Sequence, residues 1–253
     1  MDHASVQPDT THDRFLGGRL TLRQPAKGYR AGVDAALLAA ACGLRPGERL
    51  LEAGCGAGAV MLAAALRAPG AAEVVGLERD PAMAALAREN IRDNGLDGRA
   101  RVVEGDVAAG FAALGLVPFD AVAANPPFFD DADAIRGPHP TRRGAYLADD
   151  GLDGWIGFML KALREGGTLT LIHRADRLGD ILGLLAPKAG SVRVRPIQPF
   201  ADAPAKRVVV RALKTGKAPL VLLPALVLHD RSEAKYTPQA EAILRGEAAL
   251  DWG

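Results

Sequence analysis

Glu52-Ala53-Gly54-Cys55-Gly56-Ala57-Gly58 is the stretch of sequence that decides the fold. It ends a strand-like run at residues 49–52 and leads into a helix-like run at residues 60–67. Glycines in this context let the backbone approach a ligand and leave the first amide groups of the helix free to bind it. The stretch therefore predicts a nucleotide-binding turn between a strand and a helix.

The same alternation of short apolar runs and longer helical runs continues on both sides of this turn. It predicts a doubly wound α/β fold with a mainly parallel, seven-stranded sheet, a C-terminal antiparallel hairpin and a short N-terminal extension. We expect one domain, with an extension and helix at 1–45, a cofactor-binding core at 46–190 and antiparallel strands with a C-terminal segment at 191–253. Residues 1–15 are polar and are expected to be loose. The expected strands are 19–22, 49–52, 73–77, 101–103, 120–124, 168–172, 191–197 and 207–213, and the expected helices are 33–42, 60–67, 81–91, 152–164, 176–186 and 238–244.

Composition excludes several classes of protein. The chain has 253 residues, of which 49% are hydrophobic and 24% charged, so it can bury a full core. Its net charge of +1 argues neither for nor against nucleic acid, because a basic surface can be local. Two cysteines, no signal-peptide pattern and no apolar stretch of membrane-spanning length predict a cytoplasmic protein with reduced thiols and no membrane partner.

Acidic residues near the glycine turn bear on the identity of the cofactor. Glu78 ends the next expected strand, at the distance where an acid binds ribose hydroxyls in such folds. Gly54, Gly56 and Ala59 also fit the dinucleotide pattern of NAD(P) sites. Glu52 favours a cationic ligand such as S-adenosylmethionine, since a second carboxylate would repel a pyrophosphate. Asp106 follows a third strand and is expected either to accept a hydrogen bond from the cofactor's adenine or to cap the helix after it.

Asn125-Pro126-Pro127-Phe128 follows the apolar run at residues 119–124. The simplest interpretation is a turn after a strand, because Asn-Pro and Pro-Pro are common turn formers. The alternative is a clamp in which the Asn125 amide oxygen and the Pro126 carbonyl accept hydrogen bonds from a planar amino group. Pro127 would stiffen the turn and Phe128 would stack on the substrate, with Phe129 beside it, although either ring could belong to the core. The position of the motif after a fourth parallel strand favours the clamp.

With both motifs placed, the chain resembles class I S-adenosylmethionine-dependent methyltransferases of the Asn-Pro-Pro-Tyr/Phe amino-methylating group, whose fold is Rossmann-like. It is most similar to the bacterial family of tRNA1(Val) (adenine-N6)-methyltransferases, and residues 24–38, 226–229 and 236–238 share in the resemblance. The resemblance implies that Tyr29, Arg30 and Asp34 line the methionine end of the cofactor. The full set that we assign to the cofactor is Tyr29, Arg30, Asp34, Glu52, Gly54, Cys55, Gly56, Gly58, Glu78, Arg79, Asp106, Val107 and Asn125.

The clamp itself leaves the substrate open, because the amide of a protein glutamine fits it as well as the amino group of adenine does. Basic residues favour RNA as the partner, with Phe129, Arg136, His139, Arg142 and Arg143 as candidate substrate contacts. A second basic cluster at residues 188–217 could neutralise phosphates or form a solvated strand edge. We expect an N-methyltransferase acting on an adenine in tRNA. The alternatives are protein glutamine N5-methylation and a methyltransferase-like protein that only binds RNA. His139 and His173 lack metal-ligand spacing, so no metal is expected, and His229 is expected to be structural.

Overall fold

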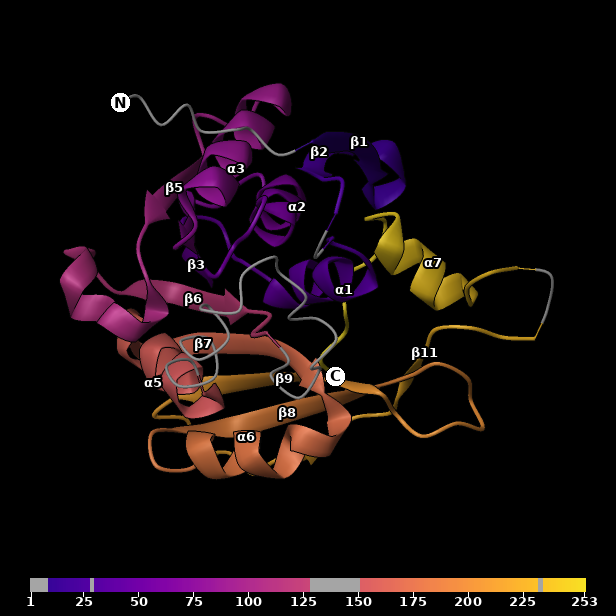
Figure 1. The fold of residues 1–253 in the computed structure, drawn as a ribbon. Helices are drawn as coiled ribbons and strands as arrows, with labels where there is room; N and C mark the ends of the chain where they lie inside the picture. Colours follow the sequence, from indigo (N-terminus) through magenta and orange to yellow (C-terminus); the bar gives the residue numbers. More distant parts are fainter. Residues whose placement is uncertain (1–8, 28–29, 128–150, 232–233) are drawn as a thin grey trace, which may run out of the picture.

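The computed structural model describes residues 9–27, 30–127, 151–231 and 234–253 (Figure 1). Strands and helices alternate through the middle of the chain, as the sequence predicts. The strands are β1 (Thr10–Phe15), β2 (Leu20–Pro25), β3 (Arg49–Ala53), β4 (Glu73–Glu78), β5 (Ala100–Glu104), β6 (Phe119–Ala124), β7 (Leu163–Arg174), β8 (Ala189–Gln198), β9 (Arg207–Lys214), β10 (Val221–Leu222) and β11 (Leu226–Val227). The α-helices are α1 (Val33–Cys42), α2 (Ala59–Arg67), α3 (Pro81–Asp93), α5 (Leu152–Ala162), α6 (Leu178–Leu185) and α7 (Pro238–Leu244).

The main sheet confirms the predicted fold class. Its strand order is β10-β8-β9-β7-β6-β3-β4-β5, with β11 also paired to β8. All neighbouring strands run parallel except β9, which is antiparallel to both β7 and β8. Within the described residues the sheet has nine strands, because the apolar run at residues 220–228 adds the two short strands β10 and β11 beyond the seven predicted.

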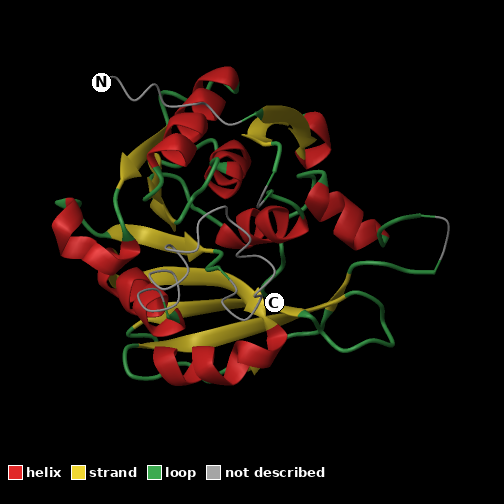
Figure 2. Cartoon of the chain, viewed as in Figure 1, coloured by secondary structure: helices red, strands yellow, loops and turns green. Residues whose placement is uncertain are grey.

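Helices cover both faces of this sheet (Figure 2). Successive strand residues point to opposite faces, so Leu50 belongs to one buried cluster and Leu51 to the other. The first cluster contains apolar residues of α1, α2 and α3, and the second contains those of α5 and α6. The faces are thus both buried, which explains why β3, β4 and β6 read as almost continuous apolar runs.

The expectation that residues 1–15 are loose was wrong for residues 10–15. These residues form β1, which pairs with β2 in an antiparallel hairpin. Along β1 exposed and half-buried residues alternate and none is fully buried. A strand of composition Thr-Thr-His-Asp-Arg-Phe carries no apolar period, so hydrophobicity alone could not reveal it.

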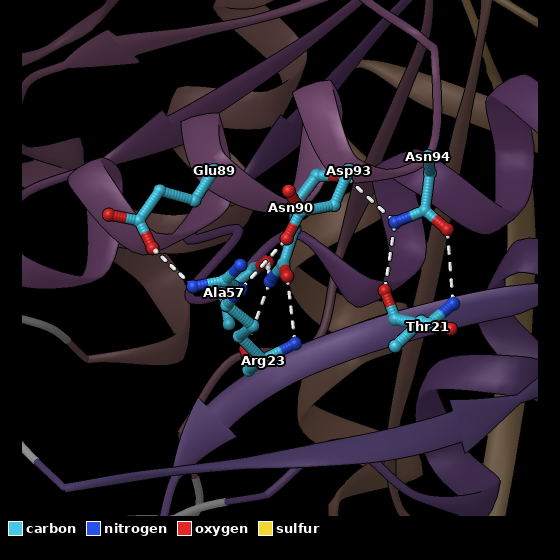
Figure 3. Close-up of polar contacts among 7 residues, drawn as sticks. All are labelled: Thr21, Arg23, Ala57, Glu89, Asn90, Asp93 and Asn94. Carbon is cyan, nitrogen blue, oxygen red and sulfur yellow. Dashed lines mark hydrogen bonds and ion pairs between the residues drawn. The ribbon is translucent and has the colours of Figure 1, made fainter.

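Asn90 of α3 and Asn94, which caps the end of this helix, bind the backbone of β2 (Figure 3). The amide oxygen of Asn90 accepts a hydrogen bond from Arg23 N, and its nitrogen donates to Arg23 O and to Ala57 O. Asn94, one turn later, makes the same pair of bonds to the backbone of Thr21. Asn90 is completely buried and also reaches the glycine turn, so it joins three separate segments.

Three arginines of the second basic cluster contact the C-terminal segment of the chain. Arg193 and Arg195 donate to backbone carbonyls of residues 224 and 251–253. The Arg211 guanidinium lies 5.7 Å from the Trp252 ring centroid, and Trp252 Nε1 donates to Ala41 O. These three arginines therefore hold the chain's own tail, which is neither of the two roles considered for them from the sequence.

Among the described residues, no helix combines the length and the apolar character needed to cross a bilayer.

The different burial of Asn90 and Asn94 leads to a prediction for the N-terminal hairpin. Asn90→Ala removes a completely buried amide and its three hydrogen bonds to the half-buried backbone of Arg23 and Ala57, so we expect the free energy of unfolding to fall by about 2–4 kcal/mol. Asn94→Ala, at a half-buried position where water can replace the lost bonds, should cost below about 1 kcal/mol. Urea unfolding of both variants measures the difference, and equal losses would contradict the bridging role of Asn90.

Candidate active site

The glycine turn lies between β3 and α2 at the carboxyl edge of the sheet. Gly54, Gly56 and Gly58 have φ values of 70°, 54° and 89°, in the left-handed region that favours glycine. Cys55 N donates to Leu77 O of the neighbouring strand β4, which ties the turn to the sheet. The Cys55 thiol is buried, and burial raises its pKa well above the ordinary value, so only the backbone of this residue is available to a ligand.

Side chains from outside the turn fix its shape. The Glu78 carboxylate accepts a hydrogen bond from Gly56 N at 2.8 Å and another from Asp80 N at 2.9 Å. The Glu52 carboxyl accepts from Met61 N at 2.7 Å, in the first turn of α2. Together with the bond from Asn90 to Ala57 O, these contacts hold the turn on three sides.

Glu52 is only 2% exposed. Burial raises the pKa of its carboxyl well above the ordinary value, and the nearby charge of Glu78 raises it further. The residue thus lies beneath the turn and caps the helix behind it. The sequence suggests that Glu52 favours a cationic cofactor. From its buried position it would act on the cofactor through the shape of the turn, and this role stays a prediction.

The residues of the turn fit an adenosyl cofactor. A Cβ at Gly56 would meet no heavy atom within 4 Å, so the backbone there borders open space. Glu78, at the end of β4, offers a carboxylate at the position where such folds bind ribose hydroxyls. Asp106 follows β5, accepts from Ala108 N as the cap of a 3-10 helix, and lies 3.7 Å from a guanidinium nitrogen of Arg79. Val107, in that short helix, is buried.

The residues assigned to the methionine end have partners within the protein. Arg30 donates to Thr11 and forms an ion pair with Asp13 of β1. Asp34, in the first turn of α1, accepts from Arg207 at 3.1 Å. Tyr29 lies outside the described residues. The structure thus brings Arg30 and Asp34 into polar networks that join the hairpin, α1 and β9, and it leaves their cofactor role as a prediction.

The Asn-Pro-Pro motif begins directly after β6, whose carboxyl end lies beside that of β3. Asn125 is half-buried with its Oδ1 shielded from solvent, Pro126 is buried and Pro127 is exposed. The motif therefore lies at the same sheet edge as the glycine turn, one strand away. The remaining candidate residues of this region lie outside the described residues: Phe128, Phe129, Arg136, His139, Arg142 and Arg143.

Trp155 of α5 packs against the glycine turn, a contact that the sequence did not predict. Trp155 is buried, and a Cβ added to Gly54 would lie only 2.6 Å from Cη2 of its ring. Only the absence of a side chain at Gly54 allows this contact. An aromatic residue in a buried helix has no distinctive sequence signal, whereas Asn90, also missed, is marked by its place between the apolar positions Ala87 and Ile91 of α3.

His173, near the end of β7, is 4% exposed and neutral. Its pKa is lowered to about 4, first by burial and then by the nearby guanidiniums of Arg177, Arg174 and Arg207, while the charge of Asp176 acts in the opposite direction. Three arginines thus lie near the carboxyl end of β7 and the start of β9, each in an ion pair with a carboxylate. Among the described residues, no group of three or more His, Cys, Asp or Glu side chains is arranged to hold a metal ion.

The turn's close packing predicts different effects for two glycine substitutions. Gly56→Ala introduces only backbone strain, because open space surrounds its Cβ, and should cost about 1–2 kcal/mol of unfolding free energy. Gly54→Ala adds a clash with Trp155, so it should cost more and also weaken S-adenosylmethionine binding more. Urea unfolding and titration calorimetry on both variants check this, and equal effects would show that Trp155 does not constrain the turn.

Burial of neutral His173 makes stability depend on pH. In the unfolded chain this imidazole has a pKa of 6.5, so between pH 6.5 and about 4 the unfolded state binds the additional proton. The free energy of unfolding should therefore fall as the pH drops through this window. His173→Gln should lose that component, which unfolding curves of both proteins at pH 7 and pH 5 measure. If both proteins lost the same unfolding free energy between pH 7 and pH 5, a buried neutral imidazole at His173 would be contradicted.

Comparison with known proteins is consistent with this geometry. Residues 50–136 match the model of the methyltransferase domain family. A tRNA1(Val) (adenine(37)-N6)-methyltransferase of Actinobacillus succinogenes is 32% identical over 64% of this chain and 68% of its own length. A protein of the same name from Musicola paradisiaca is 26% identical over 93% of this chain and 94% of its own.

Other relatives share parts of the chain or its fold. A release factor glutamine methyltransferase of Rhodospirillum rubrum is 33% identical over 55% of this chain. The match covers 44% of that protein's own length. The crystal structure of a protein from Agrobacterium tumefaciens, described as a predicted O-methyltransferase, superimposes with a TM-score of 0.72 at 28% identity. It covers 86% of this chain and 98% of its own.

The sequence match to both groups of amino-methylating enzymes agrees with the Asn-Pro-Pro motif after β6 and with the cofactor turn after β3. The chain therefore belongs to the class I S-adenosylmethionine-dependent N-methyltransferases, in the family that includes the tRNA1(Val) (adenine(37)-N6)-methyltransferases.

Proposed function

We propose that this N-methyltransferase transfers a methyl group to N6 of an adenine in tRNA. The observation that carries the proposal is the position of Asn125 and Pro126 at the carboxyl end of β6, beside the glycine turn of the cofactor site. The tRNA methyltransferases among the relatives match up to 93% of the chain, whereas the glutamine methyltransferase of R. rubrum matches 55%. This difference favours RNA as the acceptor.

The turn and the acids around it would hold the cofactor. When bound, S-adenosylmethionine supplies a methyl group already activated on a sulfonium. Glu78 would accept hydrogen bonds from the ribose hydroxyls, since a carboxylate is a bidentate acceptor matched to two neighbouring donors. Asp106 would accept from the amino group of the cofactor's adenine, and the backbone of Gly54 and Gly56 would border the rest. The other assigned cofactor residues, Arg79 and Val107 included, belong to the same proposal.

Asn125 and Pro126 would act on the substrate nitrogen. The amino group of adenine is a weak nucleophile because its lone pair is delocalised into the ring. Hydrogen bonds from its two protons to the Asn125 amide oxygen and the Pro126 carbonyl would favour a localised lone pair directed at the cofactor. Acceptors placed where positive charge develops stabilise the transition state, and alignment of the reactants contributes the rest. This chemistry requires no strong general base.

Protein glutamine N5-methylation is the second candidate, because a planar amide nitrogen presents the same two protons to the clamp. The sequence similarity to release factor glutamine methyltransferases is the observation that favours it. The two candidates share the cofactor site and the clamp, so only the identity of the acceptor separates them.

Labelled S-adenosylmethionine tests the proposal. Wild-type protein incubated with tRNA that lacks the modification, and in parallel with release factors, should place label in N6-methyladenosine and none in glutamine. Asn125→Ala should lower the transfer rate at least about 100-fold while cofactor affinity changes less than about threefold, because the lost acceptor acts on the substrate. Nucleoside and peptide mass analysis, with calorimetry of cofactor binding, measures both quantities. Label in glutamine would overturn the RNA assignment, and loss of cofactor binding in Asn125→Ala would overturn the role given to the clamp.

A further inference from the structure

Three aromatic rings lie in contact on loops that follow β8 and β11. The Phe200 and His229 ring centroids are 5.6 Å apart, and the His229 and Tyr236 rings stack at 5.1 Å with an interplanar angle of 24°. We call these residues the aromatic cluster. A cation lies near two of the rings: the Arg231 guanidinium is 5.8 Å from the Phe200 ring centroid, and Lys235 Nζ is 5.2 Å from that of Tyr236.

Backbone hydrogen bonds hold both loops to the sheet. His229 N donates to Pro199 O, which continues the pairing of β11 with β8. Lys206 N donates to Ile197 O and closes the loop that carries Phe200, while Thr237 N donates to Leu228 O and closes the other. The sheet therefore holds the ends of both loops, which lowers the entropy cost of binding a ligand on the rings.

Phe200 remains accessible within this arrangement. It is 37% exposed, and it is the one aromatic residue among the exposed large hydrophobic side chains of the described part of the chain. Arg231 forms an ion pair with Asp202 at 2.7 Å, but the two side chains are 75% and 62% exposed. Such an exposed pair is weak, so the guanidinium can exchange its partner for a phosphate.

The cluster lies at the same edge of the sheet as the clamp. β6 and β7 are parallel, and β9 is antiparallel to both β7 and β8, so β8 ends at the carboxyl edge as β6 does. Three strand spacings separate the ends of β6 and β8, which is about 14 Å. The cofactor strands β3, β4 and β5 lie on the other side of β6, so the cluster is on the side of the clamp that the cofactor leaves free.

Cationic residues occupy the interval between the clamp and the cluster. Arg174 ends β7 and lies opposite Arg207 at the start of β9, and Arg177 follows shortly after. Each of the three forms an ion pair with a carboxylate that an RNA phosphate could replace, and their guanidiniums contribute to the lowered pKa of His173. Three guanidinium groups therefore lie on the strands between Asn125 and the aromatic cluster, in which Phe200 is exposed and His229 and Tyr236 are half-buried.

We propose that the aromatic cluster, with Arg231 and Lys235, binds a nucleotide of the RNA substrate other than the methylated adenine. The combination of a stacking face with cations for the flanking phosphates is the one that single-stranded RNA requires. This inference rests on the proposed function, since it assumes that the acceptor at the clamp is part of a polynucleotide. It assigns binding of the substrate, not catalysis, to the far end of the carboxyl edge.

Substitutions at Phe200 test the inference with full-length tRNA that lacks the modification. Phe200→Ala should weaken tRNA binding about five- to a hundred-fold, as expected for loss of one stacked base, and should raise KM more than it lowers kcat. Phe200→Trp, which keeps a stacking face, should bind tRNA within about threefold of the wild type. Val117→Ala is the matched control, because Val117 is 64% exposed and precedes β6 at the opposite edge of the sheet.

Fluorescence anisotropy gives the affinities, and salt titration adds a second readout. Arg231→Ala and Lys235→Ala should each reduce the slope of log affinity against log salt by about one, since each removes one phosphate contact. A wild type that methylates tRNA, with Phe200→Ala binding it equally well, would overturn the inference and leave the proposed function standing. A wild type that binds no RNA and methylates glutamine would overturn both.

Discussion

The shape of the turn between β3 and α2 is the constraint on which the rest of the site depends. Three backbone positions in the left-handed region bring the chain round within five residues, and no side chain at Gly54 could coexist with Trp155 where it lies. Bonds from Glu52, Glu78 and Asn90 hold the turn in place. The backbone of the turn is thus held by groups that lie beneath or beside it, so a ligand that binds there would not have to order a loop.

The strand order determines which candidate functional groups lie side by side at the carboxyl edge of the sheet. The turn and the acids of β4 and β5 occupy one side of β6, the clamp follows β6 itself, and the cationic ends of β7 and β9 lie on the other side. Parallel strands deliver all of these groups to a single edge. The antiparallel strand β9 matters here because it starts at that edge and so brings Arg207 to the end of β7 and to Asp34 of α1.

The sequence predicts the regular elements well where one pattern dominates. The expected bounds of α1 and α7 agree with the structure, because an Ala-rich run and a Thr-Pro start are strong signals. β1 was missed because all of its residues except Phe15 are polar, so neither face of the strand shows an apolar period. The strands β10 and β11 were missed because two-residue pairings to β8 depend on the path of the chain and not on local composition.

The site was predictable to the extent that its residues follow strands. Glu78, Asp106 and Asn125 lie where the strand rhythm places them. Trp155 and Asn90 come from helices that pack on the turn, so their part in it emerges only in three dimensions. The charges of Arg193, Arg195 and Arg211 suggested a surface role. In the structure Arg193 and Arg195 bind backbone carbonyls of the C-terminal tail, and Arg211 lies over its Trp252 ring.

A structure of the protein in a complex with S-adenosylhomocysteine and full-length tRNA would show the acceptor at the clamp directly. We expect an adenine whose amino group lies within hydrogen-bond distance of Asn125 Oδ1 and Pro126 O, with the cofactor ribose on Glu78. An adenine bound elsewhere, or a clamp that holds no amino group in the complex, would contradict this expectation.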